Sequence, residues 1–406
     1  MANFARNAVV LGLLTAVGPF AIDMYLPALP DIGADLHTEP GMVQFSVLAL
    51  FAAVGLCQVI YGPLSDMFGR RRPLFVGMVL YTIGGIGCAL APSVEMLIAM
   101  RFLQGVGACA AMTIPRAVVR DLHTGPDAAQ LMSLVMLVFS VSPMLAPLLG
   151  SLVTEFAGWR EIFWVLAGLG VLALALALTA LPETRPPEAR IASNWGSAFS
   201  NYGRLLADRR FLGVTLIGGF GMSAFFSYIT GGSYLFIDHF GLSPIQFSAI
   251  FASNAFAFIG MAQLNGWAAR RFGLSRVVLT AATAFACFTL LLLTLTLLGR
   301  ESLVVLWAML FVSFGTLGLV VPTSAVLALD DHGPIAGTAS ALLGTTQMLL
   351  GALVTAVVSL FADGSPLPLV SGIAACGGMA ALLAWLTLGR RSGRGRGGNT
   401  VPAPAE

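Results

Sequence analysis

Long apolar stretches alternate with short polar turns along most of the chain. Because the hydrocarbon core of a bilayer is about 30 Å thick, a helix needs roughly 20 apolar residues to cross it. Twelve segments meet this requirement, and each is predicted to be a helix because a backbone in lipid must satisfy its own hydrogen bonds. Their predicted bounds are 7–28, 42–62, 73–92, 96–117, 130–152, 160–181, 211–235, 245–267, 275–298, 302–328, 335–360 and 367–388.

The longest polar break divides the predicted helices into six and six. We therefore predict an N-terminal six-helix bundle over residues 1–181, a cytoplasmic linker over 182–209 and a C-terminal six-helix bundle over 210–389. The tail, residues 390–406, is rich in arginine and glycine and is predicted to be disordered.

Apolar residues recur at helical spacing inside the linker, at Trp195, Phe199, Tyr202 and Leu206. This pattern fits a short amphipathic helix that lies on the membrane surface. It fits a plain linker equally well.

The composition supports a membrane protein and excludes an ordinary soluble domain. Only 10% of the residues are charged and 57% are hydrophobic, whereas soluble domains carry about 25% charged residues. The fold class predicted is therefore an all-α integral membrane protein with twelve transmembrane helices. The five cysteines lie in apolar segments at no metal-ligand spacing, so we expect small core residues and no metal site.

The arginines predict the orientation, because positively charged loops stay in the cytoplasm. With the N-terminus inside, 17 of the 21 arginines fall in cytoplasmic loops and termini, and only Arg160 and Arg300 fall outside. Arg101 and Arg116 lie within or at the end of the fourth predicted helix. Both termini are therefore expected to be cytoplasmic, and Arg116 is interpreted as a snorkelling anchor at the inner headgroups.

The loop after the second predicted helix reads GPLSDMFGRRRPL, residues 62–74. Gly62 and Gly69 are expected to permit a tight turn, and the arginines that begin with Arg70 and Arg71 are expected to anchor at cytoplasmic headgroups. A second copy, GWAARRFG at 266–273, keeps both glycines but has arginine in place of Asp66. The two copies indicate a duplicated six-helix unit.

Two further motifs lie on the fourth and fifth predicted helices. The fourth reads RFLQGVGACAAMTIPR from Arg101, and the fifth reads SPMLAPLLGS from Ser142 to Ser151. Small residues and prolines on the fifth helix, namely Ser142, Ala146, Pro147 and Gly150, predict close packing on a neighbouring helix.

The loop motif resembles the signature of the major facilitator superfamily. With AIDMYLPALP at 21–30, VVRDL at 118–122 and GTAS at 337–340, the whole chain resembles the Bcr/CflA branch of drug:proton antiporters. The resemblance implies the major facilitator fold and alternating access. It also implies that Arg101 belongs to a proton pathway and that the fifth-helix motif kinks and packs that helix. Ordinary packing of small residues remains the alternative for that motif.

Asp66 has two interpretations. A helix N-terminus favours a nearby anion, and the eleventh helix is expected to begin near 334–338 on the same side. Asp66 would then join the two halves when the transporter is closed to the cytoplasm, as part of a conformational switch with its loop. The alternative is a local salt bridge with Arg70 or Arg120.

Asp23 is the one acidic residue clearly inside a predicted span, where a charge costs several kcal/mol. At 1.5 Å per residue, Asp23 and Arg101 are both expected about 6 Å below the outer face of the core. We predict that Asp23 alternates between a proton and either substrate or Arg101. The alternative is a permanent buried ion pair that fixes the first helix against the fourth. Pro27 and Pro30 are expected to bend or end the first helix.

The substrate cavity is expected between the halves near the midplane. The predicted lining residues are Tyr25, Phe51, Phe139, Phe225, Phe226, Tyr228, Asn254 and Gln347. The aromatic members could accept a bulky apolar drug, although aromatic side chains that only pack are the alternative.

We therefore predict a bacterial inner-membrane exporter, working as a monomer, that exchanges a small molecule for protons and needs no cofactor. The resemblance implies bicyclomycin- or phenicol-type substrates, and export of an endogenous sugar or amino acid is the alternative. No nucleotide-binding loop or catalytic constellation is present, so neither an enzyme, an ATP-driven pump nor a nucleic-acid binder is expected. A non-transporting receptor would lack proton linkage.

Overall fold

The fold is described from a computed structural model that covers residues 2–123, 125–185, 195–330, 332 and 335–389. These residues form helices and connecting turns, with no strand among them. Twelve helical stretches in this described part are long and apolar enough to cross a membrane. The predicted all-α, twelve-span fold class is therefore confirmed. The predicted disordered tail, 390–406, lies outside the described residues.

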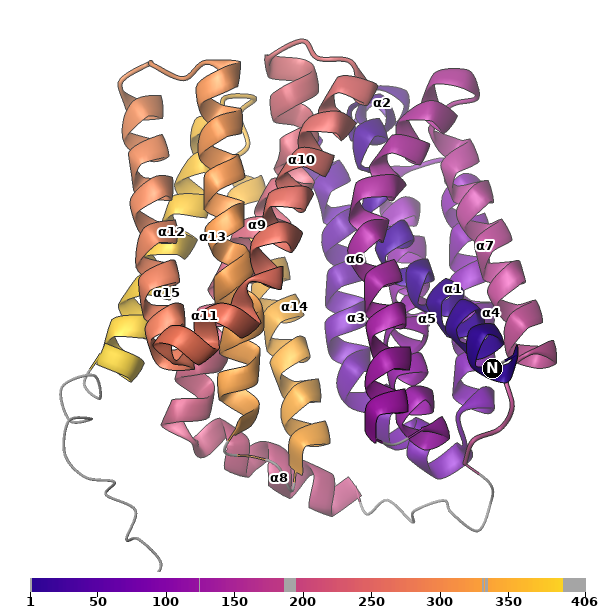
Figure 1. The fold of residues 1–406 in the computed structure, drawn as a ribbon. Coiled ribbons are helices and arrows are strands. Elements are labelled where there is room, and N and C mark those ends of the chain that lie inside the picture. The colour runs from indigo at the N-terminus through magenta and orange to yellow at the C-terminus, as the bar shows by residue number, and fades with distance from the viewer. Residues whose placement is uncertain (1, 124, 186–194, 331, 333–334, 390–406) are drawn as a thin grey trace, which may run out of the picture.

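Figure 1 shows two groups of long helices side by side, which are called here the N-terminal half and the C-terminal half. The N-terminal half contains α1 (Ala2–Asp23), α2 (Leu29–Asp35), α3 (Pro40–Phe68), α4 (Arg71–Ala89), α5 (Val94–Leu122), α6 (Gly125–Phe156) and α7 (Trp159–Thr179). The C-terminal half contains α9 (Arg209–Ser233), α10 (Pro244–Gln263), α11 (Asn265–Phe272), α12 (Leu274–Leu297), α13 (Leu303–Asp330), α14 (Ala336–Leu360) and α15 (Leu367–Leu388).

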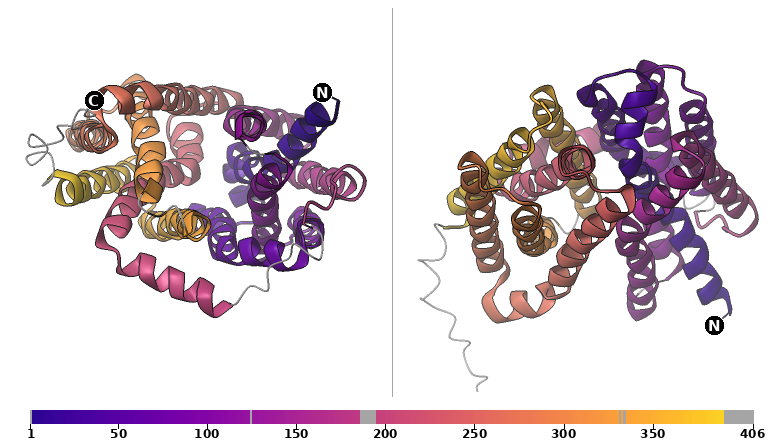
Figure 2. Two further views of the ribbon diagram at one scale, coloured as in Figure 1. Left: turned by 60° about the horizontal axis from the view of Figure 1, so that its bottom comes forward. Right: turned by 90° about the horizontal axis from the view of Figure 1, so that it is seen from above.

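One further helix, α8 (Trp195–Ala207), lies across the lower end of the C-terminal half in Figure 1. It contacts α9 and α14, and Leu205 is buried there. The short helix predicted within the linker is thus present, whereas its place on a membrane surface remains a prediction. The end of the molecule that carries α8 is called the linker end, and the opposite end is called the far end. Figure 2 shows the same arrangement in two further views, one tilted and one from above.

The first span is interrupted at Asp23. The helix α1 ends there, a 3₁₀ turn follows at Leu26–Ala28, and α2 continues the span as far as Asp35. Pro27 and Pro30 lack the N–H that an uninterrupted α-helix needs, so the predicted break is confirmed. The predicted end at residue 28 was wrong, because the span continues for seven more residues, about two helical turns, as far as Asp35. Asp23 therefore lies deeper than about 6 Å below the outer end of its span.

The break is held by α6. A Cβ atom at Gly150 would overlap the backbone carbonyl oxygen of Met24, the residue that follows Asp23. Ser142, Ala146 and Ser151 on the same helix are buried. Only a residue without a side chain lets the two backbones approach so closely. The small residues of this motif therefore fix the geometry around Asp23, and their part in transport remains a prediction.

Substituting Gly150→Ala is expected to destabilise the protein by about 1–3 kcal/mol, because the added methyl group forces the broken segment away from α6. The matched control is Gly168→Ala on α7, where a Cβ atom has nothing within 4 Å. Thermal unfolding of both variants in one detergent measures the difference. Equal melting temperatures for the two variants would contradict the packing argument.

Candidate functional site

Asp23 is the last residue of α1 and is 3% exposed. Its Oδ1 atom has no hydrogen-bond partner among the described residues. The carboxyl group is therefore buried at a helix break without a fixed protein partner. This arrangement is expected of a group that binds its ligand reversibly. That ligand can be a proton, a water molecule or a substrate.

Arg101 lies on α5 and is completely buried. Its Nη1 donates a hydrogen bond of 2.7 Å to Oε1 of Gln104, and its guanidinium lies 4.0 Å from the ring centre of Tyr25 and 5.7 Å from that of Phe163. Its Nε and Nη2 atoms have no partner among the described residues. Aromatic faces therefore stabilise this cation where a carboxylate was expected.

The structure contains no ion pair between Asp23 and Arg101, within the part of the chain that it describes. A permanent buried ion pair, the alternative interpretation of these two residues, is therefore wrong for this conformation. The physical reason is the break after Asp23: the chain leaves the helical path there, and Tyr25 rather than Asp23 reaches Arg101.

Tyr25 was predicted to line the substrate cavity, but it is completely buried within the N-terminal half. Its ring packs against Phe163 of α7 with centroids 5.6 Å apart, and its hydroxyl lies 3.3 Å from the Ser46 hydroxyl of α3. Tyr25 thus connects the break in the first span to α3, α5 and α7. In this conformation it is a support for Arg101 and does not face an open cavity.

The aromatic residues of the C-terminal half that were predicted to line the cavity mostly pack against other helices. Tyr228 is completely buried, stacks on Phe251 at 5.6 Å and accepts a hydrogen bond of 2.8 Å from Nδ2 of the buried Asn254. Phe225 packs against Phe258 and Phe314. The alternative of packing aromatics therefore describes these residues in this conformation. Their stacking energy holds α9, α10 and α13 together.

Phe51 and Phe226 meet between the two halves, with ring centroids 4.3 Å apart. Both are buried. Gln347 of α14 points towards Gly218 of α9. Phe139 of α6 lies 5.5 Å from the guanidinium of Arg116 on α5. The eight predicted lining residues therefore do not form one wall, and only the Phe51–Phe226 pair joins the halves directly.

Hydrogen bonds between the halves begin at the far end. The Tyr234 hydroxyl donates to the Leu29 carbonyl at 3.0 Å, and the Ser248 hydroxyl donates to the Pro147 carbonyl at 3.0 Å. The Ser359 hydroxyl also donates to Oε1 of Gln44. Together these bonds close the far end of the molecule.

The remaining hydrogen bond between the halves, among the described residues, lies near the middle of α3 and α14. The Thr345 hydroxyl donates to the Gly55 carbonyl at 3.0 Å. A Cβ atom at Gly344 would touch the side chain of Gln58. The halves are thus joined from the far end to the middle, and this is the conformation that the structure records.

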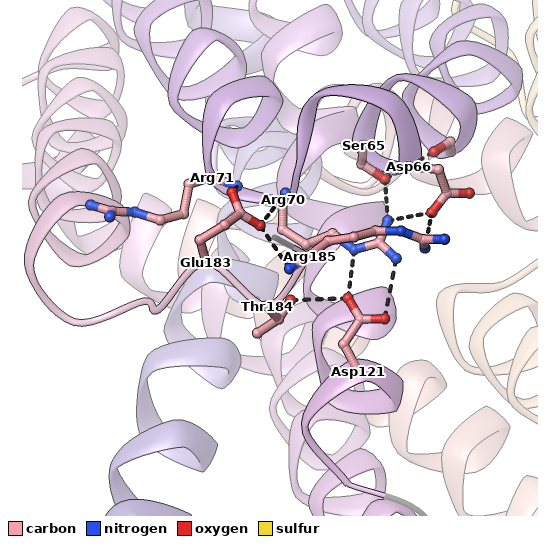
Figure 3. A network of polar contacts seen from close by, with 9 residues as sticks. Ser65, Asp66, Arg70, Arg71, Asp121, Glu183, Thr184 and Arg185 are labelled. Carbon is pink, nitrogen blue, oxygen red and sulfur yellow. Dashed lines mark hydrogen bonds and ion pairs between the residues drawn. The ribbon is translucent and has the colours of Figure 1, made fainter. Parts of the chain in front are cut away.

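A charged network occupies the linker end of the N-terminal half (Figure 3). Arg70 is 4% exposed and donates to Asp121 of α5 through Nε at 2.7 Å and Nη2 at 3.2 Å. Its Nη1 donates to Asp66 and to the Ser65 hydroxyl, both at 2.7 Å. Burial alone would lower the pKa of Arg70, but the two carboxylates raise it above its ordinary value. The cation is therefore held firmly in its charged form.

The start of the linker folds back onto this network. The Glu183 carboxylate accepts hydrogen bonds from the backbone N–H groups of Arg70 at 2.9 Å and Arg71 at 3.2 Å. Arg185 donates to Asp66 at 2.6 Å. The linker, the α3–α4 turn and the end of α5 are therefore connected as one unit (Figure 3).

Asp66 pairs with Arg70 and Arg185 and not with α14. The local salt bridge with Arg70, the alternative interpretation, is therefore what this conformation shows, and a bridge to α14 in another conformation remains a prediction. Gly69 adopts a φ of 86° and makes the predicted turn. Gly62 lies inside α3, so its predicted place in that turn was wrong.

The model of the Major Facilitator Superfamily matches residues 11–356. The chain belongs to the Major Facilitator Superfamily. It is 39% identical to the uncharacterized MFS-type transporter YdgK of Bacillus subtilis over 87% of this chain and 88% of that protein. It is 29% identical to a bicyclomycin resistance protein homolog of Haemophilus influenzae, over 95% of this chain and 97% of that one. Multidrug resistance protein D of Escherichia coli is 30% identical, over 94% and 95%.

Among solved structures, the chain is similar to a partially occluded inward open conformation of the xylose transporter XylE from E. coli. The TM-score is 0.72 with 16% identity, over 95% of this chain and 98% of that one. At this identity the likeness shows the superfamily fold alone. The relatives named for bicyclomycin and multidrug resistance confirm the resemblance to the Bcr/CflA branch.

Several polar contacts were missed by sequence reasoning, although the superfamily loop itself was found. Asp121 follows Arg120 in the quoted VVRDL stretch, and Glu183 and Arg185 begin the linker. A cluster of charges directly after the sixth apolar segment was the available signal. Ser46, Gln44 and Ser359 carry no such signal, because single polar residues in apolar helices are common.

Asp121→Asn is expected to lower stability by about 1.5–3 kcal/mol, because Arg70 loses its charged acceptor while it stays buried. The matched control is Asp127→Asn at the start of α6, where the carboxylate is exposed. Thermal unfolding in detergent reports the loss, and high salt should not reproduce it in the wild type. A loss of the same size for the control would contradict the assignment of this network.

Proposed function

We propose that this superfamily member is a bacterial inner-membrane exporter that exchanges a small, amphipathic or uncharged drug-like molecule for protons. The relatives named for bicyclomycin and multidrug resistance support this class of substrate. The observation that carries the proton coupling is Asp23, a buried carboxyl group without a fixed protein partner at a break in the first span.

The position of Asp23 at the break supplies a physical link to conformational change. A carboxyl group changes its proton affinity when its surroundings change between hydrocarbon, water and a charged partner. The segment directly beyond the break carries Leu29, whose carbonyl accepts the Tyr234 hydrogen bond from the C-terminal half. Opening of the far end would break that bond and move the segment. Asp23 would then meet a new environment, and its proton occupancy would follow the state of the gate.

Arg101 acts in this proposal as a positioning residue for the break. Its guanidinium packs on the ring of Tyr25, and the Tyr25 hydroxyl contacts the Ser46 hydroxyl on α3. A direct exchange of Asp23 between a proton and Arg101 would require a conformation other than the one described. Exchange between a proton and substrate requires only that the far-end contacts open or close.

The predicted switch fits the same scheme. With the linker end in the cytoplasm, as the arginine distribution predicts, the recorded conformation is closed to the outside. Asp66 is then held by Arg70 and Arg185 on its own side. Closure at the linker end would bring α14 towards α3, where Asp66 could exchange one of these partners for the N-terminus of α14.

The proposed exporter works as a monomer surrounded by lipid, and the proton gradient alone drives it. Within the described residues, no group of three or more histidine, cysteine or acidic side chains could hold a metal ion. The relatives named for bicyclomycin and multidrug resistance favour a drug-like molecule over a sugar or amino acid.

Asp23→Asn is expected to abolish uptake that is driven by an imposed pH gradient, because the neutral amide cannot exchange a proton. Substrate-driven counterflow without a gradient should persist. Both are measured in proteoliposomes with radiolabelled chloramphenicol, with Asp363→Asn in the exposed α14–α15 loop as the matched control. Undiminished gradient-driven uptake by Asp23→Asn would end the proposal of coupling at this residue.

A further inference from the structure

Three charged side chains of the described chain lie more than five residues from either end of a candidate span. They are Asp23 on the first span and Arg101 and Arg116 on α5. The interior thus holds two cations and one acid. When Asp23 is protonated, both cations are left without an opposing charge. Arg116, which the sequence suggests is a snorkelling anchor, has no part in the proposed proton coupling.

Arg116 has no hydrogen-bond or ion-pair partner among the described residues. Its guanidinium lies 5.5 Å from the ring centre of Phe139 on α6, and its Nε atom is buried without a partner. The carboxylate nearest in sequence, Asp121, already binds Arg70. An isolated cation in a span costs several kcal/mol unless water or an anion reaches it. The side chain is partly exposed, so it is not sealed inside the protein.

Arg116 and Phe139 can be placed along the helices relative to the contacts between the halves. The hydrogen bond from Ser248 of α10 reaches α6 at Pro147. Phe139 lies eight residues before Pro147, or about 12 Å closer to the linker end. Arg116 lies six residues before the end of α5 at Leu122. The Arg116–Phe139 pair is therefore on the linker side of the closed contacts, at the end where a molecule from the cytoplasm would enter.

We propose that Arg116 and Phe139 form a binding site for a carboxylate or similar anionic group of the exported molecule. Arg116 supplies the opposing charge and Phe139 supplies an aromatic face for the apolar part next to it. This inference rests on the proposed export function and narrows its substrate class to neutral and anionic compounds rather than lipophilic cations. A snorkelling Arg116 would instead bind the headgroup of an anionic lipid, which offers a negative charge from a different source.

The test uses chloramphenicol and its anionic succinate ester as a matched neutral and charged pair. Their affinities for the full-length protein are measured in nanodiscs made of phosphatidylcholine alone, which removes anionic lipid. The wild type should bind the succinate ester, and Arg116→Gln should weaken that binding about tenfold, as the loss of one charge-assisted hydrogen bond predicts. Arg116→Lys should retain most of it, and Phe139→Leu should weaken both compounds alike.

Two controls separate a loss of ester binding from a folding defect, and neither requires transport. Neutral chloramphenicol should bind Arg116→Gln as it binds the wild type, and Arg120→Gln, an exposed arginine one turn further along α5, should change neither affinity. Equal affinity of the wild type and Arg116→Gln for the ester, or no binding of the ester by the wild type, would overturn the inference.

Repeating the comparison with phosphatidylglycerol in the nanodisc separates the lipid source. An effect of Arg116→Gln that is present only with this anionic lipid would assign the arginine to the lipid and overturn the substrate site. Proton-driven transport of neutral chloramphenicol is measured separately. If that transport is present while Arg116→Gln leaves ester binding unchanged, only this inference fails. If the wild type transports nothing under a pH gradient, the proposed function fails instead.

Discussion

The cost of placing charge in hydrocarbon constrains every part of this molecule. Most of the chain avoids that cost by keeping charged residues near the ends of its spans. Among the described residues, the exceptions more than five residues from a span end are Asp23, Arg101 and Arg116. Arg101 is stabilised by Tyr25 and by Gln104. Asp23 has no comparable support. An acid left in this condition is sensitive to any movement that changes its surroundings, which is the property that proton coupling needs.

The surrounding fold determines how such movement can reach Asp23. On one side, Gly150 of α6 packs against the backbone of the residue that follows Asp23. On the other side, the segment beyond the break is joined to the C-terminal half through Tyr234. Far away at the linker end, Arg70 and Glu183 connect the linker to α3 and α4. The break in the first span is thus the place where the packing of one half and the gate between the halves meet.

The helices can be predicted from the sequence, but the contacts between their side chains cannot. Apolar length alone predicts twelve spans, because lipid permits few other structures, and Pro27 and Pro30 signal the break. The partner of Arg101 could not be predicted, because equal depth along two helices does not say which residue turns towards the other. The same limit applies to Tyr228 and Phe225, whose burial depends on α10 and α13. Glu183 binds backbone N–H groups, and no sequence pattern specifies such a contact.

Proton coupling at Asp23 requires that this carboxyl group gives up its proton when substrate binds. Proton release can be measured directly, with a pH-sensitive dye in weakly buffered detergent solution near neutral pH, while chloramphenicol is added to the purified protein. The wild type is expected to release about one proton for each molecule bound, and Asp23→Asn is expected to release none although it still binds. Equal release by both proteins, or binding without release in the wild type, would contradict it.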